Sequence, residues 1–176
     1  LLKNELIRKL KSALYGFGAI TIAHAVGQKL VSEKKTIAVA ESCTGGWLAK
    51  RLTDPPGASR YFRGATVVYS NRLKTKILGV SNELLRSHGA VSREVAQAMA
   101  EGIRKHYGTS LALSITGIAG PSGGSPRKPV GLVYIGLSEP SKTRAFRFRF
   151  SGDRQAVRLG ATQKAFWLIW KWLVKR

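Results

Sequence analysis

Small hydroxyl residues and glycines follow directly after an apolar, β-rich run at residues 36–40. The segment after that run reads Glu41-Ser42-Cys43-Thr44-Gly45-Gly46. Free backbone N–H groups at the start of a helix can hold an oxyanion or a phosphate, and glycines allow a ligand to come close. Ser42 is therefore a candidate nucleophile, with Thr44, Gly45 and Gly46 as candidate substrate-binding residues. The alternative is a tight turn in which Ser42 or Thr44 caps the next helix.

A serine nucleophile needs a base, and the segment 69–74 offers one. The hydroxyl is poorly reactive at neutral pH unless a histidine, or a lysine kept neutral by burial and nearby positive charge, takes its proton. Lys74 lies one turn into a helix that we expect to follow a strand. Because strand ends at one edge of an α/β sheet converge on a common crevice, Lys74 can meet Ser42. The alternative is an exposed, solubilising lysine.

The third chemically promising segment is the loop 116–131, which is too glycine-rich for a helix or a strand. Its glycines and cationic side chains are suited to cradling a phosphate or a carboxylate in a nest of N–H groups. The candidate binding residues are Thr116, Gly120, Gly123 and Gly124. The loop is not a Walker loop, because no Gly-Lys-Ser/Thr ending follows the glycines. A long structural turn is the alternative.

The elements that must position these segments alternate between helix and strand. Leucines recur every four residues up to Leu14 among basic residues, which predicts an amphipathic, basic helical extension over residues 1–18. Beyond it the patterns predict helices at 20–32, 47–52, 73–78, 81–87, 92–107 and from about 153 onward, and strands at 36–40, 65–69, 111–115, 130–137 and 143–150. This order predicts an α/β fold, a single-domain three-layer α/β/α sandwich with a mixed sheet.

The charge of the chain is unusual. Thirty Lys and Arg against nine Asp and Glu give a formal net charge of +21. Such a charge ordinarily suggests nucleic acid, an anionic surface or anionic substrates as partners. However, the basic residues are scattered through every segment, and no nucleic-acid-reading motif accompanies them. We therefore expect at most weak, non-specific nucleic-acid binding.

The number and spacing of the cysteine and histidine residues indicate the cellular compartment and whether a metal site is expected. The single cysteine, Cys43, excludes an intramolecular disulfide, and no secretory leader is apparent, so we expect a cytoplasmic protein. The apolar runs are shorter than the roughly 20 residues of a membrane helix. His24, His88 and His106 lie far apart without metal-ligand spacing, so we expect no metal site. The tryptophans of the last helix favour core packing or a dimer seam.

Together these segments resemble the C-terminal domain of the competence/damage-inducible protein CinA, which also occurs alone as nicotinamide-nucleotide amidohydrolase. The resemblance covers about residues 20–172, and residues 19–176 are expected to form this domain. It rests on the following blocks: Ala40-Glu41-Ser42-Cys43-Thr44-Gly45-Gly46, Tyr69-Ser70-Asn71 with Lys74, His88-Gly89-Ala90-Val91-Ser92, Gly117-Ile118-Ala119-Gly120-Pro121 with Gly123-Gly124, Lys128-Pro129-Val130-Gly131, and Ser151-Gly152-Asp153-Arg154.

The resemblance implies hydrolysis of the carboxamide of nicotinamide mononucleotide to nicotinic acid mononucleotide and ammonia, without a metal or another cofactor. It implies that Ser42 is the nucleophile and Lys74 the base, with Tyr69 as a third catalytic residue. We expect Arg154 and the loop 120–124 to contact the phosphate and ribose of this small-molecule substrate, and a homo-oligomeric assembly.

Some residues depart from the family pattern or compete with it. Many relatives carry an acid where this chain has Arg72, and an aspartate where it has Ser122. Arg72 is expected to help lower the pKa of Lys74 by like-charge repulsion. Cys43 is a rival nucleophile, although a packing role is favoured because some relatives carry leucine there. The alternative function is that of a catalytically silent, basic relative that binds nucleic acid or an acidic partner.

Overall fold

The computed structural model describes residue 5 and residues 14–174 of the chain. Most of the helical extension predicted over residues 1–18 lies outside the described residues, and its last part, residues 14–18, is not helical. In the described part, helices and strands alternate as the sequence predicts.

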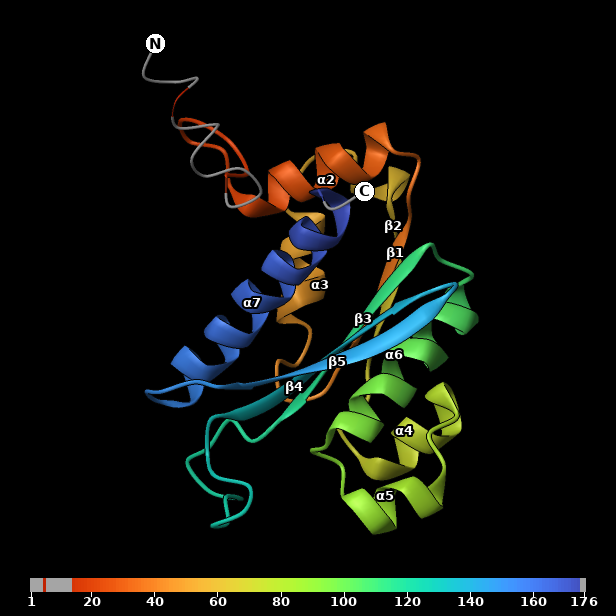
Figure 1. Cartoon of the computed structure of the whole chain (residues 1–176), viewed down its shortest axis with the longest axis vertical. Coiled ribbons are helices and arrows are strands. Elements are labelled where there is room, and N and C mark those ends of the chain that lie inside the picture. Colours follow the sequence, from red (N-terminus) through yellow and green to blue (C-terminus); the bar gives the residue numbers. More distant parts are fainter. Residues whose placement is uncertain (1–4, 6–13, 175–176) are drawn as a thin grey trace.

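A five-stranded mixed sheet forms the centre of the molecule (Figure 1). Its order is β2-β1-β3-β4-β5, in which β1 pairs parallel with β2 and β3, while the pairs β3–β4 and β4–β5 are antiparallel. The strands are β1 (Ile37–Glu41), β2 (Phe62–Val67), β3 (Leu111–Gly117), β4 (Leu132–Glu139) and β5 (Lys142–Arg149).

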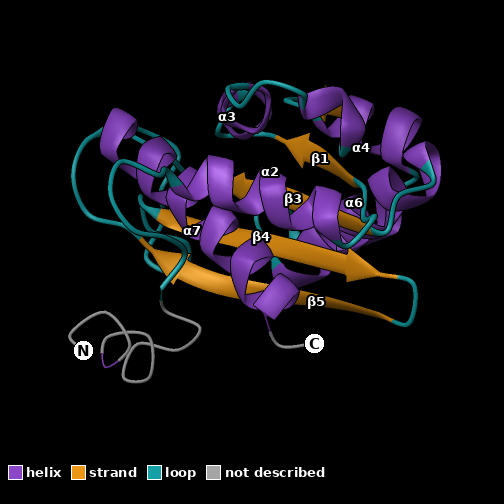
Figure 2. Ribbon diagram, turned by 90° about the horizontal axis from the view of Figure 1, so that it is seen from above, coloured by secondary structure: helices purple, strands orange, loops and turns teal. Residues whose placement is uncertain are grey.

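Helices cover both faces of this sheet, which confirms the predicted three-layer sandwich (Figure 2). One layer holds α2 (Ile22–Ser32), α3 (Trp47–Thr53) and the long α7 (Arg154–Val174). On the other face α6 (Arg93–Tyr107) packs across β1, β3, β4 and β5, and α4 (Asn71–Leu78) and α5 (Asn82–His88) pack against α6. Each face has its own cluster of buried apolar side chains, so the sheet is buried from both sides.

The strand predicted at 65–69 is shifted toward the N-terminus. Strand β2 covers Phe62–Val67, preceded by a short 3-10 helix at Ala58–Arg60 that the sequence did not predict. Its register with β1 is irregular, since Ile37 pairs with Phe62 but Ala38 pairs with Gly64. The pairing with β1 supplies hydrogen bonds to a polar stretch that local β propensity alone does not identify. Consequently Tyr69 lies in the loop between β2 and α4.

The outer strand β5 shows the alternation that its sequence predicts. Phe146 and Phe148 pack against the core on the α7 side, together with Phe150 just after the strand, whereas Arg147 and Arg149 are exposed. None of the described helices combines the length and the hydropathy that crossing a membrane requires.

Candidate active site

Ser42 lies at the carboxyl end of β1, where the central strand leaves the sheet. Its N–H donates to the carbonyl of Ile115 at 3.0 Å, so the residue is still tied to β3. Its carbonyl accepts the N–H of Gly45 at 3.1 Å, which closes a tight turn. The side chain is 8% exposed. The fold therefore fixes the backbone of Ser42 from both sides.

Glu41, the last residue of β1, fastens the start of α3. It is fully buried, and its carboxylate accepts the N–H groups of Gly46 at 3.1 Å, Leu48 at 3.1 Å and Ala49 at 2.8 Å. A carboxylate at a helix N-terminus satisfies unpaired donors and interacts favourably with the helix dipole. Sequence reasoning missed this role, although an acid at the end of a buried strand needs such partners.

Gly45 and Gly46 shape the turn. Both have positive φ angles, 61° and 92°, which residues with a side chain rarely adopt. The N–H of Gly45 donates to Ser42 and that of Gly46 to Glu41. These two N–H groups are therefore engaged inside the turn, contrary to the expectation that they face a ligand.

Lys74 meets Ser42 although α3, a short 3-10 helix and β2 lie between them in sequence. Its Nζ atom lies 3.2 Å from Ser42 Oγ and donates to the carbonyl of Val68 at 2.8 Å. Lys74 is 1% exposed, and burial lowers the pKa of its amine below the ordinary lysine value. Burial, and not repulsion from the exposed Arg72 as the sequence suggested, is the main cause of this lowered pKa.

Cys43, the rival nucleophile, is a buried free thiol. Burial is the main cause that raises the pKa of Cys43 to about 12. Since the thiolate is the reactive form, this thiol is unreactive at neutral pH. The side chain belongs to the apolar cluster between the sheet and α7, as a packing role requires.

Ser42 and Lys74 line a cavity of about 290 Å³. The predicted residues Tyr69, Thr116, Gly120, Gly123 and Arg154 line it as well. The cavity lining does not include Thr44, Gly45, Gly46 or Gly124. The rest of the lining comprises Cys43, Ser122 and six residues of the blocks above for which the sequence predicted no role in the site: Asn71, Ala90, Val91, Gly117, Ile118 and Ala119.

Arg154, at the start of α7, connects two loops at this cavity. Its Nη1 donates to the carbonyl of Gly120 at 2.9 Å and its Nη2 to the hydroxyl of Tyr69 at 2.8 Å. The residue is exposed, and these two hydrogen bonds use two of the five N–H groups of its guanidinium. Tyr69 is 59% exposed, and its hydroxyl is bound by Arg154 rather than by the Ser42–Lys74 pair.

A second arginine of α7, Arg158, stabilises the turn after Ser42 by binding a backbone carbonyl. Arg158 Nη2 donates to the carbonyl of Thr44 at 2.9 Å, and its guanidinium lies 5.2 Å from the ring centroid of Trp47. Thr44 is fully buried. Sequence reasoning missed Arg158, because only the fold brings α7 beside this turn.

The described residues do not gather a set of metal ligands at this cavity or elsewhere. Across residue 5 and residues 14–174, no three His, Cys, Asp or Glu side chains gather in a group that could hold a metal ion.

Two of the most similar curated relatives are CinA-like proteins. That of Endomicrobium trichonymphae is 47% identical over 167 residues, which cover 95% of this chain and 39% of the relative. That of Gloeobacter violaceus is 50% identical over 157 residues, covering 88% of this chain and 37% of the relative. The chain thus spans about two fifths of the length of these relatives.

This chain also aligns with solved structures of similar proteins, over nearly the whole length of each of them. A CinA superfamily protein from Klebsiella pneumoniae aligns with a TM-score of 0.85 at 32% identity, covering 88% of this chain and 97% of the other. A competence/damage-inducible protein from Agrobacterium tumefaciens aligns with a TM-score of 0.81 at 30% identity, covering 92% and 100%. The family model of the CinA C-terminal domain matches residues 19–173. This chain therefore belongs to the CinA C-terminal domain family.

Proposed function

We propose that this protein hydrolyses the carboxamide of nicotinamide mononucleotide to nicotinic acid mononucleotide and ammonia. The observation that carries the proposal is the buried Lys74 amine 3.2 Å from the Ser42 hydroxyl in a cavity. Burial, which lowers the pKa of Lys74, favours the neutral amine that a base must have. A lysine that only solubilised the surface would not lie there.

In the first half-reaction, Lys74 Nζ takes the proton of Ser42 Oγ while this oxygen forms a bond to the carboxamide carbon. The tetrahedral intermediate collapses when its C–N bond breaks and Lys74 returns the proton to the departing nitrogen, which leaves as ammonia. An ester on Ser42 remains. Water then attacks this ester and gives its proton to Lys74, and Ser42 Oγ leaves with that proton, which releases the acid.

The developing oxyanion needs a backbone donor, and Cys43 is our candidate. Its N–H directly follows the nucleophile in sequence, and Cys43 lines the same cavity. In other enzymes with a serine on a sharp strand-to-helix turn, the residue after the nucleophile supplies such a donor. The anchoring of the turn by Glu41 and Arg158 keeps this donor in place before substrate binds.

The phosphate of the nucleotide is assigned to Arg154. This exposed guanidinium uses one nitrogen for Gly120 and one for Tyr69, which leaves N–H groups for an anion. The adjoining hollow of about 580 Å³, lined by Trp47, Arg154 and Arg158 among others, extends the site toward α7. Arg154 and Arg158 both line this hollow, together with Asp153, and guanidinium groups form strong charge-assisted hydrogen bonds with phosphate.

The experiment that tests the function is ammonia release from nicotinamide mononucleotide. The wild-type protein should release ammonia with formation of the acid, and Ser42→Ala and Lys74→Met should each lose on the order of a thousandfold or more in kcat. Lys76→Met on the exposed side of α4 is the matched control and should keep wild-type turnover. A wild-type protein that releases no ammonia, or a fully active Ser42→Ala variant, contradicts the proposal.

A further inference from the structure

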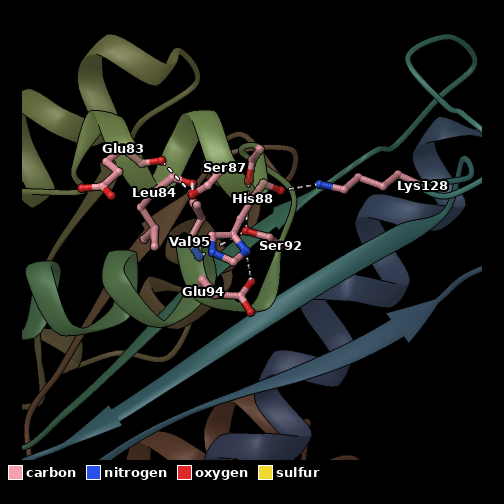
Figure 3. A network of polar contacts seen from close by, with 9 residues as sticks. Glu83, Leu84, Ser87, His88, Ser92, Glu94, Val95 and Lys128 are labelled. Atoms are coloured by element: carbon pink, nitrogen blue, oxygen red, sulfur yellow. Dashed lines mark hydrogen bonds and ion pairs between the residues drawn. The ribbon is translucent and has the colours of Figure 1, made fainter.

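The segment between α5 and α6 forms one wall of the cavity, and hydrogen bonds hold its backbone at successive residues. Ala90 and Val91 line the cavity. The carbonyl of Ala90 accepts Thr116 Oγ1 at 2.8 Å, that of Gly89 accepts Ser92 Oγ at 2.9 Å, and that of His88 accepts Lys128 Nζ at 2.6 Å. Among these donors, Lys128 comes from the loop between β3 and β4 (Figure 3), which supplies further residues of the cavity lining.

The contact of Lys128 suits the end of a helix. His88 is the last residue of α5, and the final carbonyls of a helix lack partners inside it. A cation there satisfies a carbonyl and interacts favourably with the helix dipole. Figure 3 shows the imidazole of His88 turned to Glu94, at 3.5 Å, so that Lys128 reaches only the backbone of His88. The contact therefore does not depend on the His88 side chain.

The loop itself directs Lys128 toward this carbonyl. The N–H of Ser125 donates to Lys128 O at 2.8 Å, and the N–H of Lys128 donates to Ser125 O at 3.1 Å, which closes a turn. Val130 follows, and a Cβ atom added at Gly120 would lie 2.6 Å from its Cγ1. The N–H of Gly131 donates to Ile118 O at 2.8 Å. The turn that holds Lys128 is therefore linked through Val130 to Gly120 and through Gly131 to Ile118, and both of these residues line the cavity.

We propose that Lys128 is a positioning residue that ties the glycine-rich loop to the end of α5 and so sets the distance between the two cavity walls. The proposal rests on the function proposed above for its effect on substrate. Lys128 does not line the cavity, so it acts through Ile118 and Gly120. This role of Lys128 also explains why the chain has the two sequence blocks 88–92 and 128–131, which have no part in the proposed chemistry.

The kinetic test uses Lys128→Met, which keeps an unbranched stem but removes the donor. We expect KM for nicotinamide mononucleotide to rise about tenfold with kcat within about twofold, because the bond holds a binding wall and not the reacting groups. Lys128→Arg, which keeps a cationic donor, should restore most of the lost affinity. Arg127→Met is the matched control: this neighbouring cation is exposed and lies outside the cavity lining.

Hydrogen exchange at the Ser125 and Gly131 amides tests the tie without any substrate. In Lys128→Met these amides should exchange about tenfold faster than in the wild type, while Arg127→Met should leave them unchanged. Unchanged exchange in Lys128→Met overturns the tie, and faster exchange with an unchanged KM overturns its role in positioning. If the wild type does not turn over the nucleotide, the proposed function fails, and the exchange comparison still decides the tie.

Discussion

Arg154 and Tyr69 join across the cavity through a hydrogen bond of 2.8 Å, although 85 positions separate them in the chain. The same guanidinium binds the carbonyl of Gly120. One side chain at the start of α7 therefore connects the loop before α4 with the glycine-rich loop. This places a cation where both loops meet in the lining of the cavity that holds the Ser42–Lys74 pair.

Replacing Arg154 by alanine should erase the preference for a phosphorylated substrate. In the wild type we expect kcat/KM for nicotinamide mononucleotide to exceed that for nicotinamide riboside by about 10- to 100-fold, since a charge-assisted contact to phosphate contributes about 1.5–3 kcal/mol. Ammonia release from both compounds measures this ratio. Arg147→Ala, on the exposed side of β5, is the control. Equal turnover of both compounds by the wild type would show that no phosphate site exists.

Replacing Glu41 by glutamine should destabilise the fold and the turn after Ser42 together. The amide nitrogen would face backbone N–H groups that the carboxylate now accepts, so we expect a loss of about 2–4 kcal/mol in the free energy of unfolding. Urea unfolding measures this loss. Glu101→Gln breaks only a partly exposed pair with Lys105 and should cost about 0.5 kcal/mol or less. Similar stability of the two variants would contradict the anchoring role of Glu41.

Local patterns predicted most of the fold, because apolar periodicity and capping residues specify it locally. Ser70 and Ser92 precede α4 and α6 and cap them by accepting the N–H groups of Leu73 and Val95. The shifted strand β2 was not predictable in this way, since its ends are set by pairing with β1. Arg158 was missed for a similar reason, because its contact with Thr44 spans 114 positions. Contacts between distant segments leave no local pattern in a single sequence.

The lowered pKa of Lys74 should make stability depend on pH. Folded Lys74 loses its proton at a lower pH than the unfolded chain, whose lysine has the ordinary pKa of 10.5. Between these two values the unfolded state binds more protons, so stability rises with pH by up to about 1.4 kcal/mol per unit. We expect the stability of the wild type relative to Lys74→Met to increase as the pH rises toward 10.5 in urea unfolding. A constant difference would show that the folded-state pKa is not lowered.

Removing the thiol of Cys43 should leave most of the activity. Burial keeps this thiol protonated, with a pKa of about 12, so it has no part in the proposed chemistry. Cys43→Ala should keep kcat within about threefold of the wild type, and iodoacetamide should not modify the native protein at neutral pH. Mass spectrometry of the treated protein and ammonia release check both points. An inactive Cys43→Ala beside an active Ser42→Ala would reverse the assignment of the nucleophile.

Any binding of nucleic acid should be weak, independent of sequence and unrelated to hydrolysis. The +21 charge attracts phosphates in general, and binding of this kind falls steeply with salt. About six phosphate contacts would lose on the order of a thousandfold in affinity between roughly 50 and 200 mM salt. Titration of labelled duplexes and single strands of several sequences at both salt concentrations measures this. Sub-micromolar, sequence-selective affinity at physiological salt would favour the binding function over the enzyme.

Part of the positive charge of the chain lies on the outer strand β5, where it affects how the edge of the sheet can pair. It ends the sheet beyond β4, and four of its eight residues are cationic: Lys142, Arg144, Arg147 and Arg149. A second copy that added its own β5 to this edge would bring rows of like charges to cross-strand distance, which is unfavourable. The strand thus discourages growth of the sheet from one molecule into the next, and the cations protect the protein against aggregation through this edge.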